Sequence, residues 1–387
     1  MFKKIVRLLK AIKKNKFIFS LPKKGKIFVF DWHSKKYTDK LFNKEDLVYF
    51  STRNEELNII IYLKCIFKGK FSRLFYIVEY IKFVNPKIVI TFIDNNLMFY
   101  KLRKFLNIST AFFQVGHRTY HDIFGVAKDL KLDLRSNLKV DYMFVYNDVV
   151  GKKYKSFING EYFPIGSALS NAVPINSKKK NRDLIYISNF RLLQLKKTEF
   201  VCKGLTWGEW AKSETMLINN LKIFCLANNL QFTILGKYKS DKSKYEYDYF
   251  SSLINSDKWK YIENSNERKN YNILDESQLV TGTVSTLLHE SIGRKNKTVF
   301  FGIRPDVYPI NTKFFGYFLN RPKVGPFWVN KVDEDAFQIV LNNIYKLKEE
   351  EWKKLLEGYD QDVTKYDNNN LIFKEKFNNL NIDFPVL

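Results

Sequence analysis

The sequence predicts an α/β protein made of two doubly wound, Rossmann-like domains that face a cleft. Strand-like apolar runs alternate with helix-like stretches in both halves of the chain, which is the pattern of parallel sheets covered by helices on both faces. The 387 residues exceed what one compact core usually holds. Hydrophobic residues make up 45% of the chain, so two sizeable cores can be buried and disorder is not expected.

The first half contains five predicted strands, each a short apolar run that ends in polar residues. They cover residues 26–34, 46–53, 87–96, 109–118 and 141–147. Helical periodicity fills the intervals, most clearly at 55–67 and 71–84. We therefore assign residues 1–165 to an N-terminal Rossmann-like domain.

A polar segment with a basic run, residues 166–182, separates the two halves and predicts a linker. Strand and helix signals then alternate again as far as a charged, helical tail. We assign residues 183–387 to a C-terminal Rossmann-like domain, with the option that its last helix crosses back to the first domain. Doubly wound sheets bind ligands at the carboxyl ends of their strands, so functional residues are expected there.

The charge of the chain predicts anionic partners. There are 65 Lys and Arg against 40 Asp and Glu, which gives a net charge of +25. The sequence contains no recognisable nucleic-acid-binding module or aromatic–basic ribonucleoprotein signature, so nucleic acid is not an expected partner. The phosphates of a sugar nucleotide and of anionic lipids remain.

The N-terminus predicts a basic amphipathic helix, because apolar residues recur at helical spacing among Lys and Arg in residues 2–14. Such a helix can lie on an anionic membrane surface; the alternative is a solvated helix packed on the first domain. No apolar run reaches ~18 residues, so no membrane-spanning helix is expected. Three cysteines without metal-like spacing indicate a reduced, cytoplasmic protein. The expected localisation is cytoplasmic and peripheral, at the inner face of the cytoplasmic membrane.

The strongest binding-site signal lies in residues 281–301. An apolar strand ends in a loop that contains Thr283 and Ser285, and a helix begins at Thr286. The free N–H groups and positive end of such a helix bind anions such as phosphate. Glu290 follows about one turn later, where a carboxylate can accept hydrogen bonds from ribose hydroxyls. The alternative is an ordinary capped helix with a surface glutamate.

An ordered set of motifs runs through most of the chain. FFQVGHRTYHDIF stands at 112–124, STLLHESIGRKNKTVFF at 285–301 and VGPFWVN at 324–330. In order and spacing these segments resemble a family of bacterial surface-carbohydrate (capsule and O-antigen) biosynthesis transferases with a GT-B fold. Relatives commonly have a Gly-Tyr pair where this chain has Leu288 and His289.

The resemblance implies a glycosyltransferase that uses a nucleotide-activated sugar. The N-terminal domain would bind the acceptor and the C-terminal domain the nucleotide sugar. No cofactor beyond this co-substrate is expected. No metal is expected either, because no Asp-x-Asp metal motif of the kind that metal-dependent (GT-A) transferases use is recognised; the triplets at 333–335 and 360–362 lie in the charged, helical tail. The predicted donor-binding residues are Arg118, Ser188, Arg191, Thr283, Ser285, Thr286 and Glu290.

An inverting transfer needs one base that removes the proton of the acceptor hydroxyl. The predicted catalytic residues are His117, Asp94 and Asp122. His117 follows a turn after an apolar strand, and imidazole titrates near the working pH. Asp94 ends another strand, where it is also an ordinary turn residue. Asp31 ends the first strand and is a further option.

We therefore expect metal-independent, inverting transfer of a sugar to a growing surface glycan or lipid-linked glycan. One option for the donor is a CMP-activated acidic nonulosonate, because the chain is strongly basic. Two alternatives stay open. One is a phosphotransferase of the teichoic-acid type that uses a CDP-polyol, and the other is a non-catalytic partner in polysaccharide assembly.

Overall fold

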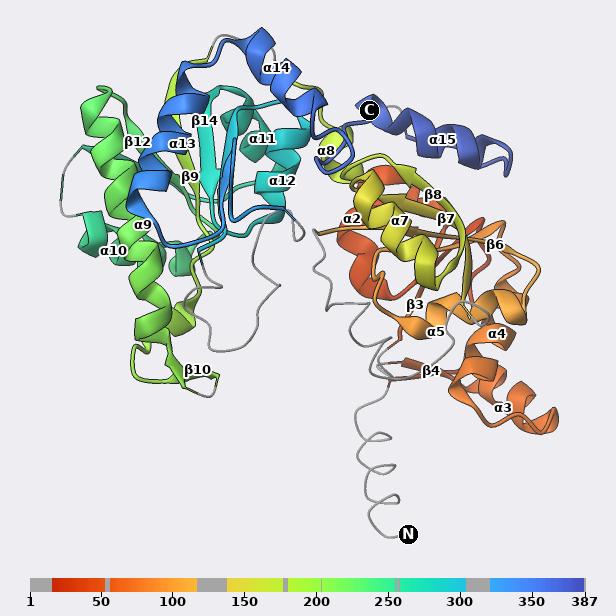
Figure 1. Ribbon diagram of the computed structural model, residues 1–387. Helices are drawn as coiled ribbons and strands as arrows, with labels where there is room; N and C mark the ends of the chain where they lie inside the picture. Colours follow the sequence, from red (N-terminus) through yellow and green to blue (C-terminus); the bar gives the residue numbers. More distant parts are fainter. Residues whose placement is uncertain are drawn as a thin grey trace. The chain divides into compact units, whose positions relative to one another are not determined.

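The computed structural model describes residues 16–52, 56–116, 138–176, 180–202, 204–254, 256, 258–303 and 321–385 (Figure 1). They form two compact units. The first unit holds the described residues up to Val115, from Leu138 to Ala172, and from Asp367 onward. The second unit holds Gly116 and the described residues from Val173 to Tyr366. The sequence analysis instead set a linker at 166–182 and counted the last residues with the second domain, with the option of a helix that crosses back.

The first unit contains a six-stranded parallel sheet in the order β3-β2-β5-β6-β7-β8. Its strands are β2 (Ile27–Phe30), β3 (Leu47–Phe50), β5 (Ile88–Thr91), β6 (Ser109–Phe113), β7 (Lys139–Val145) and β8 (Asn159–Pro164). Strands β2 and β5 are buried along their whole length, as expected for central parallel strands. The chain adds β3 on one side of β2 and β5 to β8 on the other. The strand order therefore reverses between β2 and β5, which is the topological switch point of this sheet.

Helices connect and cover these strands. They are α2 (Lys35–Leu41), α3 (Ile59–Phe67), α4 (Arg73–Val84), α5 (Leu97–Tyr100), α7 (Asp148–Phe157), α8 (Ala168–Asn171) and α15 (Leu371–Asn378). A short parallel ladder also joins β1 (Lys16–Ile18) to β4 (Glu56–Asn58), just before α3 begins. The predicted N-terminal amphipathic helix, residues 2–14, lies outside the described residues.

The C-terminal helix α15 packs on the first unit through aromatic side chains. Phe373 and Phe377 are fully buried in the same core cluster as Phe42, Phe113 and Phe144. The rings of Phe113 and Phe373 meet edge to face, with their centroids 5.2 Å apart. The last segment of the chain therefore completes the core of the unit in which the chain begins.

The second unit contains a seven-stranded sheet in the order β13-β12-β9-β14-β15-β17-β16. Its strands are β9 (Arg182–Ile187), β12 (Phe232–Leu235), β13 (Trp259–Ile262), β14 (Ser277–Gly282), β15 (Thr298–Phe301), β16 (Val324–Gly325) and β17 (Trp328–Val329). All neighbouring strands are parallel except β16 and β17, which are antiparallel. The strand order reverses between β9 and β14, so the switch point lies between these two strands.

Six α-helices of the described residues accompany this sheet. They are α9 (Trp207–Ala227), α10 (Asp241–Ile254), α11 (Glu267–Asp275), α12 (Thr286–Gly293), α13 (Glu334–Lys346) and α14 (Glu349–Glu357). Helix α9 packs against both α10 and α13, while α11 packs against α12. Figure 1 shows α9, α10 and α13 as one layer of this unit. The prediction of an α/β fold with two doubly wound sheets is confirmed.

Candidate functional site

The switch point of the second sheet brings two predicted donor segments together. Strands β9 and β14 pair in parallel, and Ile187 at the end of β9 is in register with Gly282 at the end of β14. Ser188 and Thr283 directly follow these residues. The two loops therefore leave the sheet side by side, at the edge where doubly wound folds bind ligands.

The segment between β14 and α12 contains a buried hydroxyl without a hydrogen-bond partner among the described residues, and a helix start without a side-chain cap. Thr283 is only 4% exposed, and its Oγ1 has no hydrogen-bond partner in the described part of the chain. Ser285 is the N-cap residue of α12, yet its side chain makes no capping hydrogen bond. Buried hydroxyls and helix N-termini are normally satisfied, so this loop is suited to an anionic ligand. Thr286 begins the helix and is half-buried.

Glu290 lies on α12 and is buried, whereas the sequence alternative placed it on the surface. Its Oε2 accepts a hydrogen bond of 3.1 Å from the hydroxyl of Tyr271, which belongs to α11. His289 beside it is also buried, with its ring centroid 4.9 Å from that of Phe300. The carboxylate of Glu290 is therefore held between α11 and α12, about one turn from the start of α12.

Ser188 is tied into the unit by a buried carboxylate. Its hydroxyl donates a hydrogen bond to Glu246 on α10. Glu246 also accepts hydrogen bonds from the backbone N–H groups of Lys237 and Tyr238, at 2.9–3.0 Å. Burial, together with the charge of Glu246, raises the pKa of Tyr261, whose neutral hydroxyl donates to the same carboxylate. Ser188 and Glu246 thus fix the loops that follow β9 and β12.

Arg191 is exposed after β9. Its guanidinium lies 6.0 Å from the ring centroids of both Trp207 and Trp210, at the start of α9. This is the outer limit of a cation–π contact. Its exposed guanidinium lies after the carboxyl end of β9, at the edge of the sheet where doubly wound folds bind ligands.

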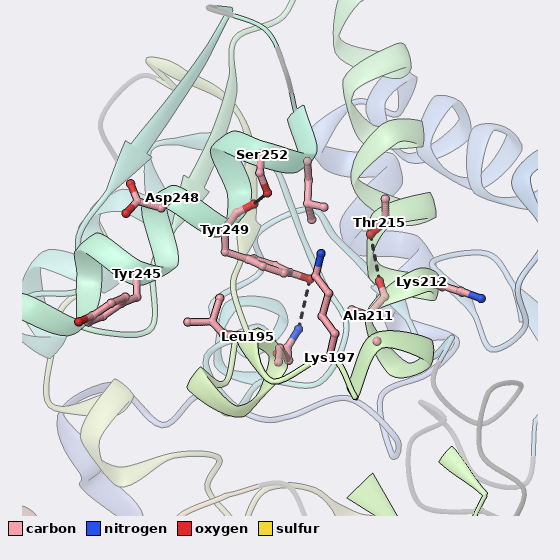
Figure 2. A pocket seen from close by; sticks show the side chains of 12 residues that line it. Leu195, Lys197, Ala211, Lys212, Thr215, Tyr245, Asp248, Tyr249 and Ser252 are labelled. Atoms are coloured by element: carbon pink, nitrogen blue, oxygen red, sulfur yellow. Dashed lines mark hydrogen bonds between the residues drawn. The ribbon is translucent and has the colours of Figure 1, made fainter. Parts of the chain in front are cut away.

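A cavity of about 470 Å³ lies elsewhere on the second unit (Figure 2). It is lined by parts of α9, α10 and the turn after Arg191, with Lys197 and Lys212 as its cations. Figure 2 shows Tyr249 crossing it, and the Tyr249 hydroxyl accepts a hydrogen bond of 3.3 Å from Gln194. None of the predicted site residues lines this cavity.

The switch point of the first sheet holds a pair that the sequence analysis recognised only in part. Asp31 follows β2 and is buried, and its Oδ1 lies 2.7 Å from Nδ1 of His33. The carboxylate also accepts hydrogen bonds from the His33 backbone N–H and from the Thr52 hydroxyl. Burial alone would raise the pKa of Asp31, but the hydrogen bonds from Thr52 and His33 outweigh it and hold that pKa below its usual value. Asp31 was named from the sequence, while His33 was missed.

Asp94, the other described candidate base, is fully buried. Its Oδ2 accepts a hydrogen bond of 2.6 Å from the hydroxyl of Tyr154. An acceptor molecule cannot reach this carboxylate without a local rearrangement. His117, Arg118 and Asp122 lie outside the described residues.

Among the described residues, no group of three or more His, Cys, Asp or Glu side chains is arranged to hold a metal ion. None of the helices in that part of the chain combines the length and apolar character that crossing a membrane requires.

Comparison with known families gives one match over most of the chain. The family model described as "putative O-antigen biosynthesis protein" matches residues 111–381. No curated protein matches the sequence significantly.

Several solved structures are similar to this chain over most of its length, at low sequence identity. A structure from Listeria monocytogenes, described as a "putative UDP-N-acetylglucosamine 2-epimerase", has a TM-score of 0.52 and 11% identity, over 94% of this chain and 99% of that chain. The wall teichoic acid polymerase TagF has a TM-score of 0.48 and 12% identity, over 98% and 96% of the two chains. The UDP-GlcNAc 2-epimerase of Methanocaldococcus jannaschii, in complex with UDP-GlcNAc and UDP, has a TM-score of 0.45 and 11% identity, over 87% and 99%. Together with the two mainly parallel, doubly wound sheets, the similarity to the Listeria monocytogenes structure confirms the predicted GT-B type of fold.

Proposed function

Because the chain belongs to the O-antigen biosynthesis protein family and has a glycosyltransferase-like fold, we propose that it is a glycosyltransferase. It transfers a sugar from a nucleotide-activated donor to a growing surface glycan. Fold alone does not determine activity, so the proposal depends on the residues at the switch point of the second sheet.

The donor site is the loop between β14 and α12. The observation that carries this assignment is the buried hydroxyl of Thr283, which has no partner among the described residues and lies just before a helix N-terminus. A donor phosphate would accept hydrogen bonds from Thr283, Ser285, Thr286 and the first N–H groups of α12. Glu290 would bind the ribose, and Arg191 would supply positive charge at the same edge of the sheet.

The transfer is inverting and needs no metal. The helix N-terminus and the arginines, Arg118 included, neutralise the departing nucleotide phosphate. The base comes from residues 1–165, the predicted acceptor-binding domain. His117, Asp94 and Asp122 remain proposals for that role, and the burial of Asp94 makes it the least accessible of the described carboxylates that follow a strand. An acidic donor sugar, such as a CMP-activated nonulosonate, is compatible with the net charge of +25.

The acceptor is a glycan or lipid-linked glycan at the inner membrane surface, and α3 is the described element that would meet the lipid. Its outward side chains are mainly apolar, and Phe67 at its end is 88% exposed. Phe71 in the following turn is 75% exposed, and Lys64, Lys68 and Lys70 lie among these residues. The exposed large hydrophobic residues of this α3 surface are Ile60, Tyr62, Leu63, Ile66, Phe67 and Phe71. An apolar surface with interspersed lysines suits an anionic membrane.

The test is thermal unfolding of the full chain with CMP, CDP, UDP, GDP and dTDP. A nucleotide that binds only the folded state stabilises it by about 2.7 kcal/mol at a hundred times its dissociation constant. One nucleotide should raise the melting temperature, and Glu290→Gln should remove most of that rise. Glu350→Gln, at an exposed glutamate of α14, is the matched control and should keep it.

The nucleotide that binds also separates the alternatives. CMP indicates a nonulosonate donor, UDP or GDP an ordinary hexose, and CDP a polyol phosphate. A CDP-dependent reaction would form phosphodiesters, which phosphorus NMR of the product detects. If none of the nucleotides changes the melting temperature, the donor site is wrong and a non-catalytic role in polysaccharide assembly becomes the better explanation.

A further inference from the structure

A buried aspartate holds a partly exposed histidine at the carboxyl end of β2. We propose that His33 is the general base of the transfer reaction and that Asp31 is its positioning residue, an inference that rests on the proposed function. The side chain of His33 is 37% exposed, while that of Asp31 is 3% exposed. An acceptor can therefore reach the imidazole but not the carboxylate that holds it.

The hydrogen bond between these residues fixes which ring nitrogen is available. An ionised carboxylate can only accept, so Nδ1 of His33 carries the proton of the 2.7 Å contact with Asp31. In the neutral ring the lone pair then lies on Nε2. No residue in the described part of the chain forms a hydrogen bond with Nε2. Asp31 thus presents the basic nitrogen away from itself, and it stabilises the imidazolium that forms when this nitrogen takes a proton.

The backbone supports a special role for Asp31. Its φ of 87° and ψ of 112° lie in a region that residues other than glycine rarely adopt. Glycine would relieve this strain but would remove the carboxylate. The strained conformation places Asp31 Oδ1 within reach of both the His33 backbone N–H and the His33 ring, while Thr52 holds Oδ2.

The position in the fold agrees with this role. Asp31 and His33 follow β2 at the switch point of the first sheet, where doubly wound sheets bind ligands. The only other described histidine, His289, is buried in the second unit.

A cavity of about 260 Å³ begins one residue before Thr52, the hydrogen-bond partner of Asp31, and offers room for part of an acceptor, although neither Asp31 nor His33 lines it. It is lined by Ser51, which precedes the Asp31 partner Thr52, and by Arg73. Burial lowers the pKa of Arg73, and the opposite charge of Asp31 partly counteracts this. Tyr62 and Phe71 of the α3 surface line the same cavity. An acceptor with an apolar part and an anionic group, such as a lipid-linked glycan, fits this combination.

The chemical step balances with these groups. Nε2 of His33 takes the proton of the acceptor hydroxyl, and the oxygen uses its electron pair to form a bond to the anomeric carbon of the donor. The bond from that carbon to the phosphate oxygen breaks, and its electron pair leaves with the nucleotide. The imidazolium then returns its proton to solvent.

The experiment returns the full chain, as wild type or variant, to cells of the same bacterium from which the gene has been deleted, and the surface glycan is measured on gels. His33→Gln should reduce the glycan at least a hundredfold, the range for loss of a general base. Its purified form should keep the nucleotide-induced rise in melting temperature. Lys36→Gln, at an exposed lysine on the neighbouring helix α2, is the control and should restore the glycan fully.

A second measurement separates positioning from folding. Diethyl pyrocarbonate modifies accessible unprotonated imidazole, and peptide mass spectrometry gives the rate at His33 as a function of pH. That pH dependence should change in Asp31→Asn and stay the same in Lys36→Gln. Normal glycan with His33→Gln, or no modification of His33, overturns the base assignment while nucleotide binding and the deletion phenotype still support the transferase. Absence of both nucleotide binding and a deletion phenotype instead overturns the proposed function.

Discussion

Arg294 and Asp275 form an ion pair that is completely enclosed in the second unit. Nη2 of Arg294 lies 2.5 Å from Oδ2 of Asp275, and neither side chain is exposed to solvent. The guanidinium also donates to the backbone carbonyls of Val173 and Pro174, at 2.9 and 3.0 Å. This pair therefore fixes the start of the second unit against the end of α12.

Replacement of Asp275 by Asn should destabilise the second unit by about 3–5 kcal/mol, because it leaves the charge of Arg294 buried without its counter-ion. Urea unfolding followed by tryptophan fluorescence measures this, since five of the six tryptophans belong to the second unit. The matched control is Glu199→Gln, which breaks an exposed pair with Lys196 and should cost at most about 1 kcal/mol. Equal effects of the two substitutions would contradict the role assigned to the buried pair.

Replacement of Thr283 by Val should have opposite effects on stability and on ligand binding. Valine has nearly the same shape and removes a buried hydroxyl without a partner among the described residues, so the free protein should gain about 1 kcal/mol. The nucleotide that binds should do so about tenfold more weakly, because one hydrogen bond to its phosphate is lost. Calorimetric titration and thermal unfolding measure the two effects.

Thr364 provides the control for this substitution. Its Oγ1 is also buried without a partner among the described residues, but it lies away from the β14–α12 loop in the sequence. Thr364→Val should give a similar gain in stability and leave nucleotide affinity unchanged. A loss of affinity in both variants would mean that Thr283 acts through the fold and not through the phosphate.

The sequence was sufficient for the parts of the fold that local patterns determine. Continuous apolar runs such as 88–91 identify buried parallel strands, and the loop before Thr286 identifies a helix N-terminus. Contacts between distant residues could not be predicted in this way. Ser188 donates to Glu246, which lies 58 residues later, and the burial of Glu290 depends on Tyr271 of another helix.

His33 was missed for a different reason, since it lies only two residues from Asp31. The spacing Asp-Trp-His after an apolar strand is visible in the sequence, and it is the signal that was available. The positive φ of Asp31 decides whether the two side chains meet, and a non-glycine residue gives no sign of it. The sequence also could not show which domain the last helix joins, because its apolar Phe373 and Phe377 could be buried in the core of either one. In the structure they lie in the core of the first unit.

The stability of the first unit should fall in acid through Glu79 on α4. Burial would raise the pKa of Glu79, but its hydrogen bond to Lys68 and the charges of Lys68 and Lys64 outweigh this and lower it. A folded-state pKa below the usual value of 4.5 means that the stabilisation is present above that value. It is lost as the pH falls through 4.5 and then through the lowered pKa, because the unfolded chain binds the proton first.

Urea unfolding between pH 3 and 6, followed by circular dichroism, measures this effect. Glu79→Gln should lose about 1 kcal/mol at pH 6 and show a weaker dependence on pH than the wild type. Glu45→Gln, at an exposed glutamate, is the control and should behave like the wild type. If the pH dependence of Glu79→Gln equals that of the wild type, other carboxylates cause the loss.

Binding to anionic vesicles should depend on the two most exposed aromatic side chains of the α3 surface. Phe67 and Phe71 are 88% and 75% exposed, and insertion of each ring into the interface would contribute about 1.5–3 kcal/mol. Phe67→Ser with Phe71→Ser should therefore weaken co-sedimentation with phosphatidylglycerol vesicles more than tenfold. Phe200→Ser, at a residue of the second unit that is 70% exposed, is the matched control and should bind like the wild type.

Because the lysines of the α3 surface add electrostatic attraction, binding should also fall as salt rises and be weak with phosphatidylcholine alone. Equal binding of the α3 double variant and the control would place the membrane contact elsewhere on the chain, with residues 2–14 as the next segment to test.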